Sequence, residues 1–354
     1  VKLWSRMLSL QSLDATDIAP LIGDDENSII QRKDETSKGK GDQITYGLQI
    51  QLQGRGFSEN DVAEGQGEAL ATHSDSLTIN ELGHMVGIKS EVTIDSQRIT
   101  FEPRNKARMG LKDWWKARYS VSALNQLCGN TAQSDTYYTG MQATVAPSTT
   151  GNRIIRQNSR SADESLVASD VFTLDLIDRV KEQATTKQLD SNGNPTIPRI
   201  RPVNVGGDEK FVILINDKQI TDMKTNTGNG QWQDIQKAAF AGSQASKNPI
   251  FTGALGEHNG CVLRRAEDLP AGVNSSTGAA VSNTARAVLL GAQAGAIAFG
   301  AKYENGSMRW HERVYDAGRR MEVSAWRIWG LKKVRFNSTD FGTVVISTYA
   351  AAHT

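Results

Sequence analysis

One stretch of the sequence, residues 43–53, alternates without a break between polar and apolar side chains. Its apolar members are Ile44, Tyr46, Leu48, Ile50 and Leu52, and glutamine, threonine or glycine stands at every position between them. Period-two alternation is typical of a β-strand with one covered face and one wet face. At about 3.3 Å per residue the strand would be roughly 35 Å long, which is long for a strand.

A shorter alternating run, Ser76 to Ile79, offers a return strand, so the two runs would form a two-stranded ribbon. The segment between them is glycine-rich and acidic, with one basic residue, Arg55, against Glu59, Asp61, Glu64, Glu68 and Asp75. A two-stranded ribbon is marginal in water, so its apolar row needs a cover. Two interpretations stay open: an ordinary strand pair in a sandwich, or an arm laid on a neighbouring copy.

Composition excludes several classes of protein. The 354 residues suffice for a large core in one or two domains. Lys and Arg total 40 against 39 acids, a net charge of +1, so no global basic field marks a dedicated nucleic-acid binder. The only cysteines, Cys128 and Cys261, are far apart, which indicates a reducing compartment rather than a disulfide framework.

Membrane and secretory segments are not expected either. No stretch reaches the roughly 20 apolar residues of a membrane span. The nearest, Ala287 to Ala301, consists largely of Ala and Gly and predicts a tightly packed buried helix. The first residues, Val1 to Trp4, lack the basic-then-apolar plan of a signal peptide.

Residues 103–128 are predicted to form a long helix. Thr100 and Pro103 suit its start and Gly129 with Asn130 its end. Lys112 and Lys116 would lie opposite its apolar stripe; such a basic face could touch phosphate, although a solvated surface is the commoner explanation. The predicted apolar stripe consists of Ala107, Leu111, Trp114, Ala117, Val121, Leu124 and Cys128.

The rest of the chain predicts a second helix and a set of strands. Thr173 can cap a helix whose apolar face holds Leu174, Ile177, Val180 and Ala184. The turn-rich residues 190–195 predict a domain boundary. A short helix is expected at 232–239, and strands are expected at 211–215, 262–263, 308–315, 321–336 and 344–349. Within Arg309 to Arg313, charged and apolar residues alternate, as in a strand with charged solvent positions.

Catalytic motifs are scarce, and no catalytic, cofactor-binding or metal-ligating residue is assigned. The sequence has no His-Glu-x-x-His pair and no Gly-x-Ser-x-Gly elbow. His258 and Cys261 lie three apart near a Gly-rich stretch, yet no orienting base is identifiable. An enzyme acting through residues 248–260 therefore remains only the weakest of the alternatives.

Several segments, in order, resemble the major capsid proteins of coliphage N-four-like tailed phages. They include Ser28 to Lys33, Lys38 to Asp42, Trp114-Trp115 and Leu174 to Arg179. The resemblance is most specific at Asn248-Pro249-Ile250-Phe251-Thr252-Gly253-Ala254-Leu255-Gly256 with Asn259-Gly260, and continues through Phe336 and Asp340-Phe341-Gly342.

This resemblance implies an α+β chain with the Hong Kong 97 type capsid fold. Residues 1–41 would be an N-terminal arm and 42–83 an extended β-hairpin loop. Residues 84–194 would form a peripheral domain with its spine helix at 103–128. Residues 195–304 would form an axial domain, and 305–354 would return as strands to the peripheral domain.

The implied function is that of a major capsid protein, a structural protein that assembles with itself into pentamers and hexamers of an icosahedral head. A portal protein, scaffold and decoration proteins and non-specifically held double-stranded DNA are the implied partners, with no membrane and no cofactor. The implied location is the virion, assembled in the bacterial host cytoplasm. An encapsulin-like compartment shell of the same fold is the alternative.

A shell subunit gives the ribbon a role as an inter-subunit contact. The apolar row from Ile44 to Leu52 would be hidden on an adjacent subunit, and the acidic segment with Arg55 would lie beside it. The acids predict a basic landing surface, for which Arg104, Lys106 and Arg108 are candidates.

Overall fold

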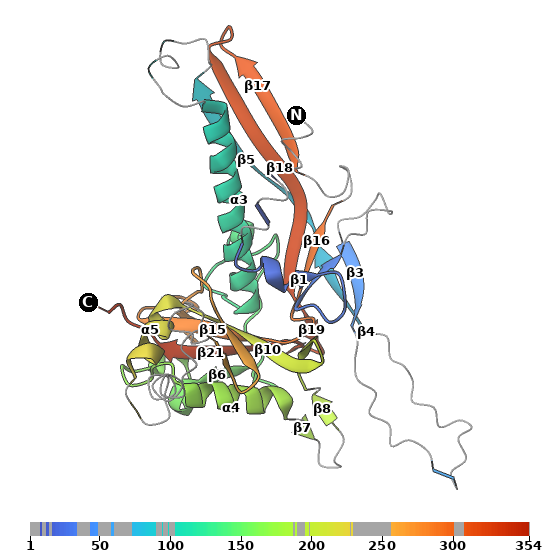
Figure 1. The fold of residues 1–354 in the computed structure, drawn as a ribbon, viewed down its shortest axis with the longest axis vertical. Helices are drawn as coiled ribbons and strands as arrows, with labels where there is room; N and C mark the ends of the chain where they lie inside the picture. Colours follow the sequence, from blue (N-terminus) through green and yellow to red (C-terminus); the bar gives the residue numbers. More distant parts are fainter. Residues whose placement is uncertain are drawn as a thin grey trace, which may run out of the picture.

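The computed structural model places its two largest β-sheets at opposite ends of an elongated molecule, with helices α3 and α4 on separate sheets (Figure 1). It describes residues 8, 12–13, 16–33, 43–48, 58–59, 73–89, 94, 98, 103–186, 188–189, 195–197, 199–226, 228, 256–300 and 308–353. The predicted helix at 232–239 and most of residues 248–256 lie outside these ranges. Few helices and mixed sheets make the chain α+β, as predicted.

The first sheet has its longest strand, β18, at the centre. Strand β5 pairs with β18 from Arg320 to Trp329, β17 pairs with it from Arg320 to Trp326, and β16 pairs with its end. The strands, in the order β1-β2-β16-β18-β17 with β5 on the other side of β18, are β1 (Ile22–Gly23), β2 (Ile30–Lys33), β5 (Asn80–Lys89), β16 (Gly295–Phe299), β17 (Arg309–Tyr315) and β18 (Arg320–Lys333). The strands predicted at 308–315 and 321–336 are confirmed.

Helix α3 (Pro103–Leu127) covers one face of this sheet, close to the predicted 103–128. Its end is a Schellman motif: the amide of Asn130 donates to the Asn125 carbonyl at 2.9 Å and that of Gly129 to the Gln126 carbonyl at 3.1 Å. Gly129 has φ of +61°, a left-handed conformation that favours glycine. The predicted end of the helix is therefore confirmed.

The predicted stripe of α3 is confirmed at Ala107, Leu111, Leu124 and Cys128, which are buried, but it is wrong in the middle of the helix. Trp115 and Tyr119 are buried, whereas Ala117 is exposed and Trp114 only half-buried. The Tyr119 ring lies 4.9 Å from that of Trp329 on β18, edge to face, so these aromatic side chains form the contact with the sheet. Two adjacent tryptophans fit the apolar period almost equally well, so the sequence could not decide which one faces inward.

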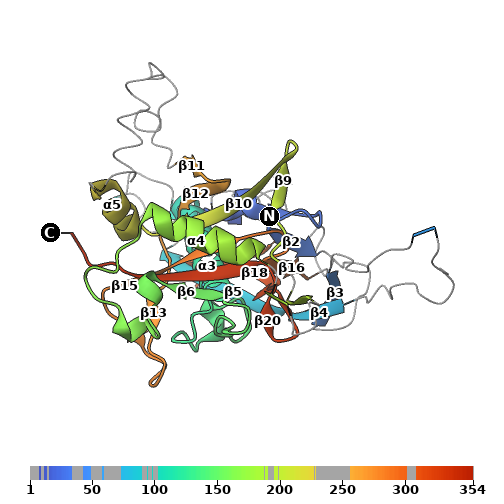
Figure 2. The same cartoon turned by 90° about the horizontal axis from the view of Figure 1, so that it is seen from below.

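The second sheet carries a second hydrophobic core. Helix α4 (Leu174–Thr185) lies against it (Figure 2), with Ile177, Val180 and Ala184 buried as predicted, although Thr173 makes no side-chain capping bond. The strands, in the order β11-β12-β10-β15-β21-β6 with β9 paired to β10, are β6 (Ile154–Arg156), β9 (Val203–Val205), β10 (Asp208–Ile215), β11 (Glu257–His258), β12 (Cys261–Arg265), β15 (Thr284–Leu290) and β21 (Thr343–Tyr349).

The remaining elements are short. Helix α5 (Asp217–Thr225) follows β10 and is capped by Asn216, whose side chain accepts a bond from the Lys218 amide. The other elements are β3 (Gln43–Leu48), β4 (His73–Thr78), β7 (Gln188–Leu189), β8 (Pro195–Ile197), β13 (Gly272–Val273), β14 (Ala280–Val281), β19 (Arg335–Phe336), β20 (Thr339–Asp340) and the 3-10 turns η1 (Ala19–Leu21), η2 (Thr136–Tyr138), η3 (Gln157–Ser159) and η4 (Asp163–Ser165).

The helix predicted for Ala287 to Ala301 is wrong. The segment instead contains most of β15 and all of β16, which belong to different sheets. Its small residues allow close approach of backbones: a Cβ at Gly291 would lie 2.5 Å from the Arg201 carbonyl oxygen. Tight packing was expected correctly, but Ala and Gly alone did not distinguish a strand from a helix.

The sheet pairings cross the predicted domain boundaries. β21, expected with the peripheral strands, pairs along its whole length with β15, and β6 pairs with β21. β16, expected in the axial part, pairs with β18 and β2. The chain thus passes between the two sheets more often than a division into consecutive segments of sequence would allow.

Candidate assembly surfaces

The base of the ribbon is anchored in its own subunit. β3 and β4 pair in the predicted antiparallel way, from Gln43 opposite Thr78 to Leu48 opposite His73. Ile44, Tyr46 and Leu48 are buried and pack in one cluster with Leu77 and with side chains of the same chain, namely Ala296, Ala298, Val334 and Phe341. The expectation that a neighbouring copy covers these three residues is therefore wrong, because β16 and the residues after β18 cover them.

Asp75 holds the base of the ribbon in place through an ion pair and a hydrogen bond, in addition to the apolar packing. Lys332 Nζ donates to Asp75 Oδ1 at 2.6 Å, and the Tyr46 hydroxyl donates to Asp75 Oδ2 at 3.2 Å. Burial raises the pKa of Tyr46, and the Asp75 charge raises it further, so the phenol remains a neutral donor. Asp75 thus belongs to the anchored base and is not one of the acids available to a partner.

The other predicted ribbon contacts are not tested by this geometry. Glu59 is exposed. The remaining residues of the set lie outside the described residues: Ile50, Leu52, Arg55, Asp61, Glu64 and Glu68.

The residues predicted to receive the acidic segment of a neighbouring copy lie at the start of α3. One of them, Arg104, already forms an ion pair within its own subunit. Arg104 forms a two-pronged contact with both carboxylate oxygens of Glu312, each at 2.7 Å. Burial raises the pKa of Glu312, but the bonds from Trp310 and Arg104 outweigh it, so the pKa is lowered. Lys106 is exposed and Arg108 half-exposed. Arg104 therefore holds α3 to β17 and has little remaining charge for a neighbour.

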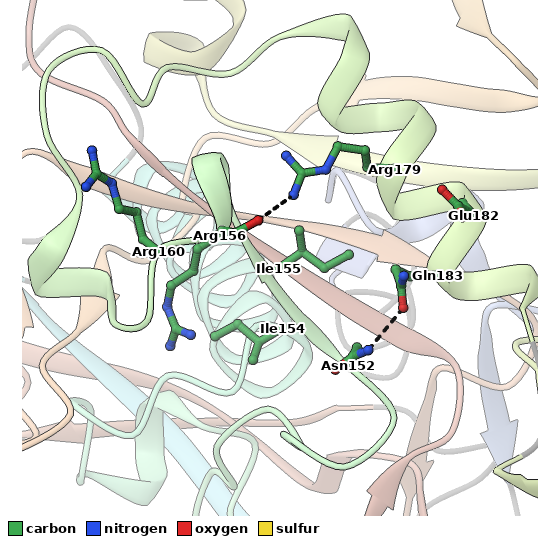
Figure 3. A pocket seen from close by; sticks show the side chains of 9 residues that line it. Asn152, Ile154, Ile155, Arg156, Arg160, Arg179, Glu182 and Gln183 are labelled. Atoms are coloured by element: carbon green, nitrogen blue, oxygen red, sulfur yellow. Dashed lines mark hydrogen bonds between the residues drawn. The ribbon is translucent and has the colours of Figure 1, made fainter. Parts of the chain in front are cut away.

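A hollow of about 300 Å³ lies between α4 and β6 (Figure 3). Its arginines point in different directions rather than towards one centre. Arg156 pairs with Asp163 at 2.6 Å and Arg160 with Asp170 at 2.8 Å, while Arg179 donates to the Ser159 hydroxyl at 3.2 Å. Two of the three charges are neutralised within the fold, so the hollow has the character of a surface depression rather than a reactive site.

The geometry also weakens the enzyme hypothesis for residues 248–260. His258 lies opposite Cys261 across the β11–β12 pair, and its Nε2 lies 3.2 Å from Asp178 Oδ1. Cys261 is buried, and this burial raises the pKa of its thiol to about 11. A buried neutral thiol is a poor nucleophile near neutral pH.

Two buried charge clusters at the junction of the sheets were not predicted. The Arg286 guanidinium donates to Asp163 Oδ2 and to the carbonyls of Cys128 and Gly129 at the end of α3. Lys333, also buried, donates to Asp340 Oδ2 at 2.9 Å. Arg286 and Asp163 are 123 positions apart in sequence, so only the tertiary fold pairs them, whereas Lys333 and Asp340 are seven positions apart.

Among the described residues, no group of His, Cys, Asp or Glu could hold a metal ion. Within the same residues, none of the helices combines the length and the apolar character that crossing a bilayer requires.

Comparison with known proteins identifies the family. A family model described as phage capsid protein matches residues 1–352. The major capsid protein of Pseudomonas phage KPP25 is 24% identical over 382 residues, covering 99% of this chain and 94% of that protein. The capsid of Ralstonia phage GP4 has a TM-score of 0.75 and 27% identity, covering 94% of this chain and 90% of that one. The capsid of Cyanophage Pam1 has a TM-score of 0.70 and 19% sequence identity, covering 95% of this chain and 92% of that one.

These matches confirm the resemblance and the Hong Kong 97 type fold predicted from the sequence. They favour a phage capsid over an encapsulin-like compartment and over an enzyme. The chain belongs to the phage capsid protein family and is a major capsid protein, a structural component of the virion.

Proposed function

We propose that this chain forms the pentamers and hexamers of an icosahedral head that encloses double-stranded DNA. The observation that carries the proposal is the match of residues 1–352 to the phage capsid family, which spans both sheets and the ribbon. Closed shells repeat one set of contacts around symmetry axes, so each subunit needs surfaces that fit other copies of itself.

In this proposal the sheet built around β18 with α3 is the peripheral part of the subunit. The sheet built around β10 and β15 is the axial part, near the local five-fold and six-fold axes. The part of the ribbon beyond Leu48 would lie on an adjacent subunit and bring Ile50 and Leu52 against it. Many such contacts act together, so each can be weak.

The partners follow from the same proposal. A portal protein occupies one vertex, and scaffold and decoration proteins act during or after assembly in the bacterial host cytoplasm. DNA touches the inner face without sequence specificity. The near-neutral charge of the chain, +1, suits this role, because a strongly basic wall would hold DNA tightly and oppose its release.

Electron microscopy of the purified full chain under assembly conditions tests the proposal. We expect closed shells with five-fold and six-fold clusters of subunits. A compact monomer at every protein and salt concentration would contradict it. Replacing His258 with Ala separates this proposal from the enzyme hypothesis. The replacement should leave assembly unchanged, because the proposal gives His258 no catalytic role.

A further inference from the structure

Residues 350–353, here called the tail, lie beside helix α5 at one end of the second sheet (Figures 1 and 2). Directly after β21, the amide of Ala350 donates to the Asn283 carbonyl at 2.8 Å. Three residues later, His353 Nε2 lies 3.0 Å from Asp222 Oδ1 on α5. This pair connects the segment after β21 to the helix after β10.

The two members of the pair have different surroundings. The side chain of Asp222 is 9% exposed, whereas that of His353 is 46% exposed. The second carboxylate oxygen of Asp222, Oδ2, is buried and accepts no hydrogen bond from the described residues. A carboxylate removed from water is costly unless a counter-charge or donors replace that water. His353 is therefore in the position to supply a counter-charge to a carboxylate that has few other partners.

The electrostatics of Asp222 agree with this geometry. Burial raises the pKa of Asp222, and the charge and the hydrogen bond of His353 lower it only in part. The other charged or titratable side chains of α5 and β21 are Asp217, Lys218, Lys224 and Tyr349. Asp217 already accepts a bond from Arg265 Nη2 of β12 at 2.8 Å. The two lysines are exposed, so water and salt screen their charges from the pair.

The remaining contacts of α5 with the second sheet are made by uncharged side chains. Gln219 is buried, and its Nε2 donates to Thr348 Oγ1 at 2.7 Å and to the Ala285 carbonyl at 3.2 Å. Ile220 and Met223 pack in the core of that sheet. None of these contacts changes its charge with pH, whereas a histidine side chain ordinarily takes up a proton near pH 6.5.

We propose that the tail binds α5 in a proton-dependent way. In mild acid His353 is a cation, and it holds residues 350–353 against the Asp222 carboxylate. Above neutral pH the imidazole loses its charge, the buried carboxylate loses its counter-charge, and the tail and α5 separate more readily. This inference concerns the single subunit and does not rest on the proposed function.

Both groups give the pH dependence the same sign. A carboxyl group whose pKa is raised in the folded state contributes stability below that pKa, and this contribution disappears as the pH rises through it. A histidine with an acidic partner likewise contributes stability in its protonated form, which is lost as the pH rises past neutrality. The contact between the tail and α5 should therefore weaken between pH 6 and pH 8.

Hydrogen exchange of the dissociated subunit tests the proposal. The protection factors of the α5 amides should be about three- to fivefold higher at pH 6 than at pH 8. Protection factors are corrected for the intrinsic effect of pH on exchange, so the remaining difference belongs to the structure. His353→Gln keeps a hydrogen-bond donor without the charge and should abolish the difference. His353→Arg carries a permanent charge and should keep the high protection at both pH values.

The matched control is His258→Gln, because His258 also pairs with an aspartate on the second sheet. The side chain of that aspartate, Asp178, is 48% exposed, so it does not need a counter-charge. This control should leave the protection of α5 and its pH dependence as in the wild type.

Three outcomes would overturn the proposal. The first is equal protection of α5 at the two pH values in the wild type. The second is a pH difference that persists in His353→Gln, which would assign it to another group. The third is a loss of protection at pH 8 in His353→Arg as large as in the wild type, which would show that the charge of residue 353 is not the cause.

Discussion

Asp163 connects several elements at the junction between the two sheets. Its side chain is fully buried and accepts bonds from Arg286, from Arg156 and from the Val273 amide at 2.9 Å. Burial alone would raise its pKa, but the Arg286 charge and these bonds outweigh burial, so the pKa of Asp163 is lowered. The ionised carboxylate holds together η4, β13, β15 and the end of α3.

Asp163→Asn should lower the free energy of unfolding of the dissociated subunit by about 3–5 kcal/mol at pH 7, because two arginines lose their buried counter-charge. A lowered folded-state pKa stabilises the fold above the unfolded pKa, and this contribution disappears as pH falls through the folded value. The gap between wild type and variant should therefore narrow in acid. Urea denaturation at pH 7 and pH 3 measures it.

A matched control is Asp113→Asn, which removes an exposed carboxylate on α3 and should change stability by less than about 0.5 kcal/mol. If the Asp163 variant were as stable as this control at pH 7, the cluster would not hold the junction.

At the scale of elements, α3 offers two glycines with opposite roles. Gly129 is left-handed, and a Cβ there would lie 2.7 Å from the Val145 carbonyl oxygen. Gly129→Ala should therefore cost about 1–3 kcal/mol of unfolding free energy. Gly110 lies within the helix with nothing within 4 Å of an added Cβ, so Gly110→Ala should gain about 0.5–1 kcal/mol.

Thermal unfolding of both variants beside the wild type checks the pair. Equal shifts of the two midpoints in the same direction would show that the C-terminal motif of α3 does not depend on glycine.

The ribbon shows what the sequence can and cannot predict about an element. The alternation around Tyr46 correctly predicted a strand with one covered face and its antiparallel partner. It could not show what covers that face, because Ala296 and Val334 lie about 250 or more positions away in sequence. The long helix was found from its stripe and terminal signals, whereas the helix predicted at Ala287 to Ala301 failed because small residues suit tight packing in either structure.

Leu77→Ala tests whether the base of the ribbon belongs to the subunit's own core. Leu77 is fully buried, so its truncation should lower the unfolding free energy of the dissociated subunit by about 2–5 kcal/mol. Chemical denaturation below the assembly concentration gives this value. A loss seen only in assembled shells would return Ile44, Tyr46 and Leu48 to the inter-subunit contacts.

At the scale of the whole molecule, two buried charge clusters and three hydrophobic clusters hold the described part of the subunit together, the base of the ribbon included. Strands β5 and β18, by contrast, leave Met85 and Trp326 exposed. A subunit can have a well-packed interior and still leave apolar side chains exposed on its surface. A shell subunit must fold first and then recognise other copies.

Ile50→Ala with Leu52→Ala separates these two requirements. If these side chains contact another copy, the double variant should keep the unfolding midpoint of the dissociated subunit but assemble only at a higher protein concentration. A loss of about 1.4 kcal/mol per subunit would raise this threshold roughly tenfold, since assembly depends on concentration as binding does. Light scattering over a concentration series measures the threshold concentration for assembly. Leu77→Ala is the comparison variant, because it is expected to lower the stability of the dissociated subunit itself. A double variant that lost stability like Leu77→Ala, with an unchanged threshold, would place the outer ribbon in its own core and leave shell formation to other surfaces.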